Sequence, residues 1–432
     1  MSTNGNAGGA DQVRFRDVSL DSYNTMEGMA HAHEQALARH YEDFLIVDVD
    51  SHHYENESFS EIAEYITDPV LRHDATFQGL ARTGIGVGNG SYQELGGRVI
   101  RYRGRRKEKV PPVPHRDITL MRRWMDALGT DMACMFPTPM LNLSLSPNIA
   151  VQNGLAWAYN SWLCERILAE DPRINSMLYL PFHDPEQCFK TVKHFAGKKG
   201  VIGFMVTSTH YRSVFDNGYV KTYKLLEEMG LPLAFHSATG GEPGLRIFNR
   251  FFGVHALGFC WHNMLHLTNW LISGMPERFP RLRTIWIESG LAWIPFLMQR
   301  LDNEYMMRSS EVPLLKRRPS EYMREMYFSS QPMEMVENRE ALELTFKLIN
   351  AETQLLYASD FPHWDMDLPS TIYDLPFLDE RQKRNILGGN AQRLFNLKPQ
   401  WSEWKLKRRA ERGGSNAGAS TGAAASAGGV PA

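Results

Sequence analysis

The sequence predicts an α/β protein of the (β/α)8 TIM-barrel class with long inserted loops. Eight short apolar runs follow one another along the chain. Near-continuous apolar runs of this length are typical of strands that are buried on both faces of a parallel sheet. Helical patterns separate the runs, and eight strand–helix alternations within roughly 350 residues favour a closed barrel. An open, doubly wound sheet is the alternative, but no G-x-G-x-x-G motif follows the first run.

The strands and helices can be placed by their periodicity. The eight apolar runs cover residues 44–49, 132–136, 176–180, 201–206, 231–235, 282–287, 326–330 and 354–358. Helical patterns cover residues 151–169, 219–229, 291–305, 336–349 and 379–395. In the first of these, the apolar positions Leu155, Trp162 and Leu163 share one helix face because of the 3.6-residue period.

The chain divides into a barrel and two ends of different composition. Residues 1–40 are predicted to be an N-terminal extension that is partly disordered, and residues 41–400 the barrel. Residues 401–432 begin as a basic segment and become a Gly/Ala/Ser-rich tail, which has too little apolar bulk to offset the entropy of ordering. Two insertions, at about 68–117 and 237–281, exceed the usual length of a connection. The first contains a predicted hairpin around residues 97–102.

Composition excludes several classes of protein. The formal net charge of −2 gives no reason to expect a nucleic-acid partner. No apolar stretch reaches the roughly 18 residues of a membrane helix, and the N-terminus lacks the pattern of a secretory signal. The four cysteines form no C-x-x-C pair and are expected to be free thiols. We therefore expect a cytoplasmic protein that acts on a small molecule, and a homo-oligomer is left open.

Four predicted strand ends carry side chains that bind divalent metals. They are Asp50 and His52 at the first, His236 at the fifth, Glu288 at the sixth and Asp360 at the eighth. In a parallel barrel the active site lies at the carboxyl ends of the strands. Carboxylates and imidazoles there are the ligands of a catalytic divalent ion. Asp50 and His52 are two residues apart, so they face the same side of a strand.

Each of these residues alone has a simpler explanation. Asp48 or Asp50 could cap a helix, and Glu288 and Asp360 could cap the helix or turn that follows them. His236 alone would more often be a hydrogen-bonded core histidine. The combination of ligand-type side chains at four strand ends favours a metal site, because unrelated caps would not follow this pattern.

Several segments, in order, resemble the amidohydrolase-related family. These are Asp48-Val-Asp-Ser-His52, Pro232-Leu-Ala-Phe-His236, Phe279-Pro-Arg-Leu-Arg283, Glu288-Ser-Gly-Leu-Ala-Trp293, Arg300-Leu-Asp302, Tyr357-Ala-Ser-Asp-Phe-Pro-His363 and Asn390-Ala-Gln-Arg-Leu-Phe395. The similarity spans roughly residues 44–396. This branch of the amidohydrolase superfamily contains aminocarboxymuconate-semialdehyde decarboxylase, resorcylate-type decarboxylases and hydrolases of ring-fission products.

The resemblance implies one divalent metal, held by Asp50, His52, His236, Glu288 and Asp360. The family's first-strand motif is usually His-x-His, and here Asp50 replaces its first member. Glu288 stands where the decarboxylases have a histidine on the sixth strand. Both changes replace an imidazole by a carboxylate, so the site should accept manganese or iron as well as zinc, which we expect first.

Further residues are expected around the metal. By resemblance, Arg300 and His363 are near the site, and His53 follows the first-strand ligands. We expect all three to bind substrate. His262 and His266 lie four residues apart on one helix face and are expected to have structural or pocket-lining roles.

Two reactions and one non-catalytic function fit this site. The sequence favours a hydrolase, in which a metal-activated water attacks the substrate and His236 and Asp360 are catalytic, with Asp360 as general base. The alternative is a non-oxidative decarboxylase, a carboxy-lyase in which Asp360 protonates the carbon that loses carbon dioxide. Hydrolysis is preferred because the two additional carboxylates should weaken binding of an anionic carboxylate. A barrel that only binds a ligand would not need Asp360.

Overall fold

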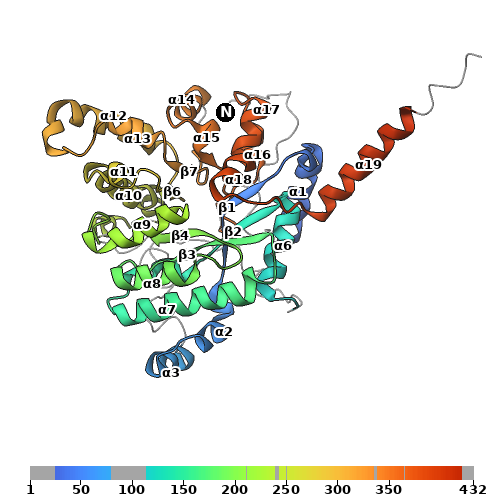
Figure 1. The fold of residues 1–432 in the computed structure, drawn as a ribbon. Helices are drawn as coiled ribbons and strands as arrows, with labels where there is room; N and C mark the ends of the chain where they lie inside the picture. The colour runs from blue at the N-terminus through green and yellow to red at the C-terminus, as the bar shows by residue number, and fades with distance from the viewer. Residues whose placement is uncertain are drawn as a thin grey trace, which may run out of the picture.

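Eight parallel strands form the centre of the molecule, hydrogen-bonded in the order β1 to β8 (Figure 1). The computed structural model describes residues 25–78, 113–210, 212–238, 243–249, 251–334, 338–363 and 365–420. The strands are β1 (Val47–His53), β2 (Met132–Pro137), β3 (Ile174–Tyr179), β4 (Val201–Thr207), β5 (Leu233–His236), β6 (Thr284–Ile287), β7 (Tyr327–Ser329) and β8 (Leu355–Leu356). Each predicted apolar run overlaps one of these strands, which confirms the predicted fold class.

Helices surround the strands (Figure 1). The first half of the chain contains α1 (Thr25–Ala38), α2 (Phe59–Glu64), α3 (Pro69–Gln78), α6 (Arg116–Leu128), α7 (Ile149–Trp162), α8 (Pro185–Phe195) and α9 (Val220–Met229). The second half contains α10 (Phe251–Ile272), α11 (Met275–Arg278), α12 (Trp293–Arg308), α13 (Pro319–Met323), α14 (Arg339–Leu348), α15 (Ala351–Gln354), α16 (Ser370–Tyr373), α17 (Glu380–Arg384), α18 (Asn390–Phe395) and α19 (Glu403–Ser420).

The barrel is closed by hydrogen bonds between β1 and the end of β8. Val49 N donates to Tyr357 O at 3.0 Å, and Asp360 N donates to Asp50 O at 2.8 Å. An isolated parallel bridge joins Ser51 to Phe361 beyond the end of β8. Closure brings the carboxyl ends of β1 and β8 together, so the side chains that follow these strands can share one site.

The strands are buried on both faces, as their apolar runs predict. Every residue of β1 and β4 is buried, and in β7 only Tyr327 is half-buried. Some helices begin or end at residues that satisfy their terminal backbone groups. The Asp184 carboxylate accepts a hydrogen bond from Gln187 N at 3.0 Å at the start of α8. At the end of α9, Gly230 takes a φ of 68°, a left-handed conformation that glycine adopts without strain.

Parts of both predicted ends are packed against the barrel. Helix α1 contacts α6, and its residues Met29, Ala32 and Ala36 are buried. The basic segment after residue 401 forms the start of α19, in which Lys405 is fully buried. Its ammonium lies 2.6 Å from Asp131 Oδ2, so this part of the predicted tail is held against the barrel by a buried ion pair.

Other parts of the predicted ends and insertions are outside the described residues. These are residues 1–24, the predicted hairpin around residues 97–102, and residues 421–432 of the Gly/Ala/Ser-rich tail. Figure 1 shows α19 extending away from the barrel. The second insertion, residues 237–281, contains the 22-residue helix α10.

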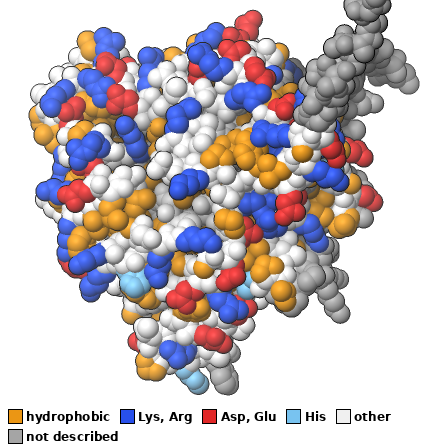
Figure 2. Space-filling model, turned by 45° about the vertical axis from the view of Figure 1, so that its right-hand side comes forward, with side chains coloured by type: hydrophobic (Ala, Val, Ile, Leu, Met, Phe, Trp, Pro, Cys, Tyr) orange, Lys and Arg blue, Asp and Glu red, His pale blue; other side chains and the backbone are white. Residues whose placement is uncertain are grey.

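Charges of both signs are mixed on the face of the molecule shown in Figure 2. Lys and Arg side chains lie among Asp and Glu side chains over this face, in agreement with the small net charge. Within the described part of the chain, no helix combines the length and apolar character needed to cross a membrane.

Candidate metal centre

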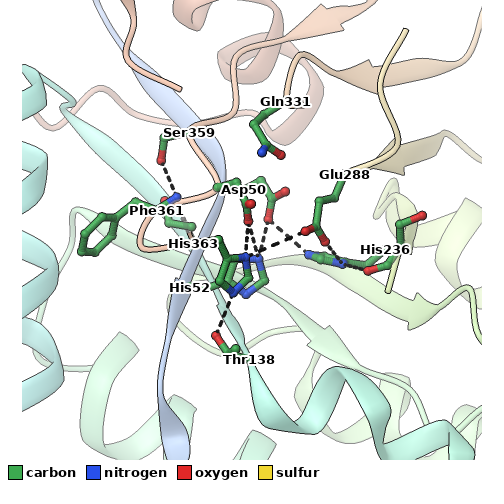
Figure 3. A network of polar contacts seen from close by, with 12 residues as sticks. Asp50, His52, Thr138, His236, Glu288, Gln331, Ser359, Phe361 and His363 are labelled. Carbon is green, nitrogen blue, oxygen red and sulfur yellow. Dashed lines mark hydrogen bonds and ion pairs between the residues drawn. The ribbon is translucent and has the colours of Figure 1, made fainter. Parts of the chain in front are cut away.

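Six polar side chains meet at the carboxyl ends of β1, β5, β6 and β8, and five of them are labelled in Figure 3. We call them the histidine–carboxylate cluster. Its members are Asp50 and His52 in β1, His236 at the end of β5, Glu288 after β6, and Asp360 and His363 after β8. All six are buried. Because burial of charged groups is unfavourable unless they are compensated, the cluster needs a physical explanation.

Asp50 lies between two histidines. Its Oδ1 atom is 3.1 Å from His52 Nε2 and 3.2 Å from His236 Nε2. Asp50 and His52 therefore face the same side of β1, as their spacing predicts. Among the described residues, two groups have potential ligand atoms that all lie within 4.8 Å of one another, and these three residues form one of them.

Asp360 joins the cluster through His52 and His363. Its Oδ1 atom lies 3.3 Å from His52 Nε2 and 2.7 Å from His363 Nδ1. His52, Asp360 and His363 form the second group of potential ligand atoms. His363, which the sequence suggested only as a substrate-binding residue, is thus in contact with a predicted ligand. Its Nε2 atom lies 3.3 Å from Thr138 Oγ1.

Glu288 occupies the opposite side of His236. Its Oε2 atom is 3.5 Å from His236 Nδ1, whereas Asp50 lies at Nε2 of the same ring. Glu288 Oε1 also lies 3.8 Å from His363 Nδ1. Glu288 is in neither group of potential ligand atoms, so the structure places it beside two histidines of the cluster.

The two strand histidines are oriented as metal ligands are. His52 Nδ1 lies 2.9 Å from Pro137 O, and His236 Nδ1 lies 2.8 Å from Ser237 O. A carbonyl oxygen can only accept, so both Nδ1 atoms donate and both Nε2 atoms face the cluster. A hydrogen bond of this kind fixes the orientation of metal-bound histidines in proteins.

The distances within the cluster also fit a metal ion. With metal–ligand bonds of about 2.1 Å, adjacent ligand atoms lie about 3.0 Å apart in an octahedron and about 3.4 Å apart in a tetrahedron. The three contacts of His52 and His236 with Asp50 and Asp360 span 3.1 to 3.3 Å. In addition, Asp50 Oδ2 and Asp360 Oδ2 are buried with no hydrogen-bond partner among the described residues. The residues present therefore fit a divalent cation.

The charge balance supports the same conclusion. Burial lowers the pKa of His52, but the adjoining Asp360 and Asp50 outweigh this effect and raise the pKa to about 10. Burial alone would raise the pKa of Asp50, but His236 and His52 hold it well below its usual range. Burial raises the pKa of Asp360 to about 7, although His52 opposes this shift. The carboxylates thus stabilise a positive charge at His52 Nε2. A bound cation would take the place of the proton on this atom.

Two residues at the site have unusual backbone conformations. Glu288 has a φ of 57° and Asp360 a φ of 55°, in the left-handed region that residues other than glycine seldom occupy. Glu288 N donates to Ser329 Oγ at 3.0 Å, and Asp360 N to Asp50 O at 2.8 Å. Strained residues of this kind are concentrated at functional sites. Here the conformation turns each side chain at a strand end into the cluster.

Asp48 shares the strand parity of Asp50 but has a different role. The pairing of β1 with β2 shifts register between Asp48 and Ser51. Asp48 accepts hydrogen bonds from Ser51 Oγ at 2.7 Å and Ser359 N at 2.9 Å. It therefore fixes β1 to the end of β8 beneath the cluster.

Two of the proposed substrate-binding residues lie outside the cluster. Arg300 is on α12, its side chain is 60% exposed, and it lies 3.8 Å from Glu304. His53 faces away from the cluster, with Nε2 2.9 Å from Tyr159 OH and its ring stacked on Trp162. The structure thus gives no support to a substrate contact by either residue within this chain.

The pair His262 and His266 is separate from the cluster. His266 Nε2 lies 2.8 Å from Ser208 O, and His262 Nδ1 lies 3.1 Å from Gly258 O. Neither belongs to a group of potential ligand atoms in the described residues. This agrees with the expected structural role.

Two residues at the site were not identified from the sequence. Thr138 follows β2 and contacts His363, and Gln331 follows β7 above the cluster (Figure 3). Glu55 holds the loop of Thr138, accepting from Thr138 N at 2.9 Å and Met140 N at 2.6 Å. A threonine or glutamine is not by its type a sign of a functional site. The position of Thr138 and Gln331 just after predicted strands is the one sequence feature that could have identified them.

Comparisons with known proteins give the family. Residues 125–397 match the family model Amidohydro_2, described as amidohydrolase. Gamma-resorcylate decarboxylase from Polaromonas sp. (strain JS666) is 24% identical over 260 residues, which are 57% of this chain and 77% of that protein.

Solved structures of low sequence identity share the fold. A 5-carboxyvanillate decarboxylase from Sphingomonas paucimobilis has a TM-score of 0.58 and 20% identity, over 82% of this chain and all of its own. A 5-carboxyvanillate decarboxylase from Novosphingobium aromaticivorans, in complex with manganese and 4-hydroxy-3-methoxy-5-nitrobenzoic acid, has a TM-score of 0.60 and 18% identity. That match covers 82% of this chain and 97% of the other. With its family match over more than half of its length, the chain belongs to the Amidohydro_2 family of the amidohydrolase superfamily.

Proposed function

We propose that the protein is a metal-dependent, non-oxidative decarboxylase of a small aromatic acid. The observation that carries this proposal is a buried histidine–carboxylate cluster in a barrel whose relatives include gamma-resorcylate and 5-carboxyvanillate decarboxylases. The sequence favoured hydrolysis, but the relatives support the alternative of decarboxylation.

The preference for hydrolysis rested on the negative charge that Asp50 and Glu288 add to the site. In the structure Asp50 lies between His52 and His236, and Glu288 is 3.5 Å from His236 Nδ1. Each added carboxylate thus has an imidazole as its neighbour, and the two positive charges of a bound divalent ion would offset both, so an anionic substrate is less strongly repelled than it would be by two isolated carboxylates.

Asp50, His52, His236 and Asp360 are the residues that would hold the metal. A bound divalent ion would supply a positive charge that orients the carboxylate of the substrate and stabilises the negative charge that develops on its ring. Two imidazoles with two carboxylates suit manganese or iron as well as zinc. We favour manganese over zinc because the cluster is rich in carboxylate oxygen and because the Novosphingobium relative contains manganese.

Asp360 is the proposed proton donor. In the reaction the bond between the ring carbon and the carboxylate breaks, carbon dioxide leaves, and the electron pair on the ring carbon accepts a proton. Burial raises the pKa of Asp360 to about 7, whereas a bound cation would lower it, so Asp360 needs a neighbouring acid to supply the proton that it passes to the ring carbon. His363 Nδ1, 2.7 Å away, can return a proton to Asp360. The His363 side chain is 9% exposed whereas Asp360 is 0%, so His363 is closer to solvent protons.

A reconstitution experiment tests this proposal. The purified protein would be stripped of metal, reloaded with Mn²⁺ or Zn²⁺, and mixed with 2,6-dihydroxybenzoate or 5-carboxyvanillate. We expect release of carbon dioxide and formation of the decarboxylated phenol, with the metal-free protein inactive and the Mn²⁺ form more active than the Zn²⁺ form. Absence of any decarboxylation by both metal forms, together with hydrolysis of an ester, amide or ring-fission product, would reject it.

A further inference from the structure

Gln331 follows β7, between the ends of β6 and β8 that carry Glu288 and Asp360. It is fully buried. Figure 3 shows its amide group pointing from β7 toward Asp50 and Glu288. Strand β7 contributes no member of the histidine–carboxylate cluster, although the ends of the strands on both sides of it do.

The orientation of the Gln331 amide is determined by Asp365. Gln331 Nε2 lies 3.4 Å from both Asp365 O and Asp365 Oδ2. Because a backbone carbonyl only accepts, the NH₂ group must face Asp365 and the amide oxygen must face the other way. Asp365 is itself held at its carboxylate by His255 Nε2 of α10, 3.2 Å away.

This orientation leaves an acceptor without a donor. Gln331 Oε1 is buried and has no hydrogen-bond partner among the described residues. A buried amide oxygen without a partner is unfavourable, and nearly all such atoms in native proteins have a protein or water partner, so we expect a donor to reach this one. The partner must supply a hydrogen-bond donor, and it must lie at the end of the barrel where substrate is expected.

We propose that Gln331 Oε1 accepts a hydrogen bond from a ring hydroxyl of the substrate, so that Gln331 selects hydroxylated aromatic acids. The inference rests on the proposed function, since it places an aromatic acid at this end of the barrel. The carboxylate of the acid is directed to the metal. Gln331 Oε1 accepts a hydrogen bond from a ring hydroxyl next to that carboxylate. His255 and Asp365 act as positioning residues because they hold the amide group.

Binding of two analogues tests the inference independently of catalysis. The probes are 2-nitroresorcinol, which is bound in the Polaromonas dihydroxybenzoic acid decarboxylase structure, and 2-nitrophenol, which has one hydroxyl fewer. Both would be titrated into the Mn²⁺-loaded full chain by calorimetry. We expect Gln331→Met, which keeps the side-chain length but removes the acceptor, to weaken binding of 2-nitroresorcinol about 10- to 100-fold and that of 2-nitrophenol less than about 3-fold. Gln331→Asn, which withdraws the amide, should show the same selective loss.

The matched control is Gln354→Met. Gln354 is a half-buried glutamine immediately before β8, at the opposite end of the strand from the cluster, and its Nε2 donates to Met326 O. This variant should bind both probes as the wild type does. Manganese content is measured for every protein, and the Gln331 variants should retain the wild-type amount.

The outcomes separate this inference from the proposed function. Equal weakening for both probes, or loss of manganese in the Gln331 variants, would show that Gln331 serves the metal or the fold and would overturn the inference. If the Gln331 variants do not fold, the wild type alone decides: binding of the two probes within 3-fold of each other contradicts a hydroxyl contact. Selective binding without any decarboxylation would support the contact and reject the proposed reaction.

Discussion

Replacement of Asp360 by asparagine tests its proposed role as proton donor. Asparagine has the same shape, and it tolerates the left-handed φ of 55° at this position. The variant loses the ability to hold and donate a proton. General acid–base catalysis contributes about 10²–10⁴-fold to enzyme rates. His363 Nδ1 lies 2.7 Å from Asp360 Oδ1 and can replace part of this function, so we expect the lower part of that range.

The expected fall in kcat is therefore about 10²–10³-fold, which corresponds to about 3–4 kcal/mol of activation free energy. Because His52, His236 and Asp50 remain, we expect much of the metal to be retained. The assay is initial-rate decarboxylation at saturating Mn²⁺, with metal content measured by elemental analysis. Asp374→Asn is the control, since Asp374 pairs with Arg39 at 2.6 Å on the outside of the barrel, and its rate should stay within about 2-fold of wild type. A rate for Asp360→Asn within 3-fold of wild type would exclude Asp360 as the proton donor and make it a structural residue.

Three further predictions concern the metal and the two parts of the tail. His236→Ala should lose most of the bound metal in elemental analysis, because the change removes one of a few ligands; a full complement of metal in the variant would contradict this. Lys405→Met should lower the free energy of unfolding by about 3 kcal/mol in a urea titration, because it leaves the buried Asp131 carboxylate without its ion pair. The control Lys407→Met, at an exposed position, should change the free energy of unfolding by less than about 0.5 kcal/mol. Equal effects of the two variants would argue against a stabilising ion pair. Deletion of residues 413–432 should leave the melting temperature and turnover nearly unchanged, and a drop of more than about 4 °C would show that this segment packs.

The barrel could be predicted because parallel strands buried on both faces have a distinctive pattern. All eight strands coincide with apolar runs, even though β8 is only two residues long in the structure. The positions of Asp50, His52, His236 and Asp360 could be predicted for a related reason. The carboxyl ends of all strands meet at one end of a barrel, so residues distant in sequence become neighbours there.

The direction of individual side chains was harder to predict. Glu288 follows β6 as expected, but its left-handed backbone directs the carboxylate to His236 Nδ1, and no sequence pattern specifies that angle. Asp48 has the right parity for the cluster, but it accepts hydrogen bonds from Ser51 and Ser359 beneath the cluster. Arg300 matched a family motif, yet the exposed face of α12 carries it away from the cluster.

The residues that the sequence did not identify carry ordinary polar groups. Thr138 carries a hydroxyl and Gln331 an amide, and both residues lie in loops. Such side chains are common in solvent-exposed turns, so their presence in the sequence does not indicate a site. Only the structure shows that Gln331 is fully buried and that its amide oxygen has no partner among the described residues. Burial of the basic residue Lys405 likewise depends on Asp131, which is distant in the sequence.

The fate of isotopic label in the product tests the central claim most directly. The Mn²⁺-loaded protein would be incubated with 2,6-dihydroxybenzoate in D₂O and, separately, in ¹⁸O-labelled water, and the organic product analysed by mass spectrometry. We expect loss of carbon dioxide, one deuterium on the ring carbon that carried the carboxylate, and no ¹⁸O in the organic product. If instead the turnover substrate proves to be a ring-fission product, ester or amide, and ¹⁸O enters a product carboxylate or hydroxyl, the protein is a hydrolase and not a decarboxylase.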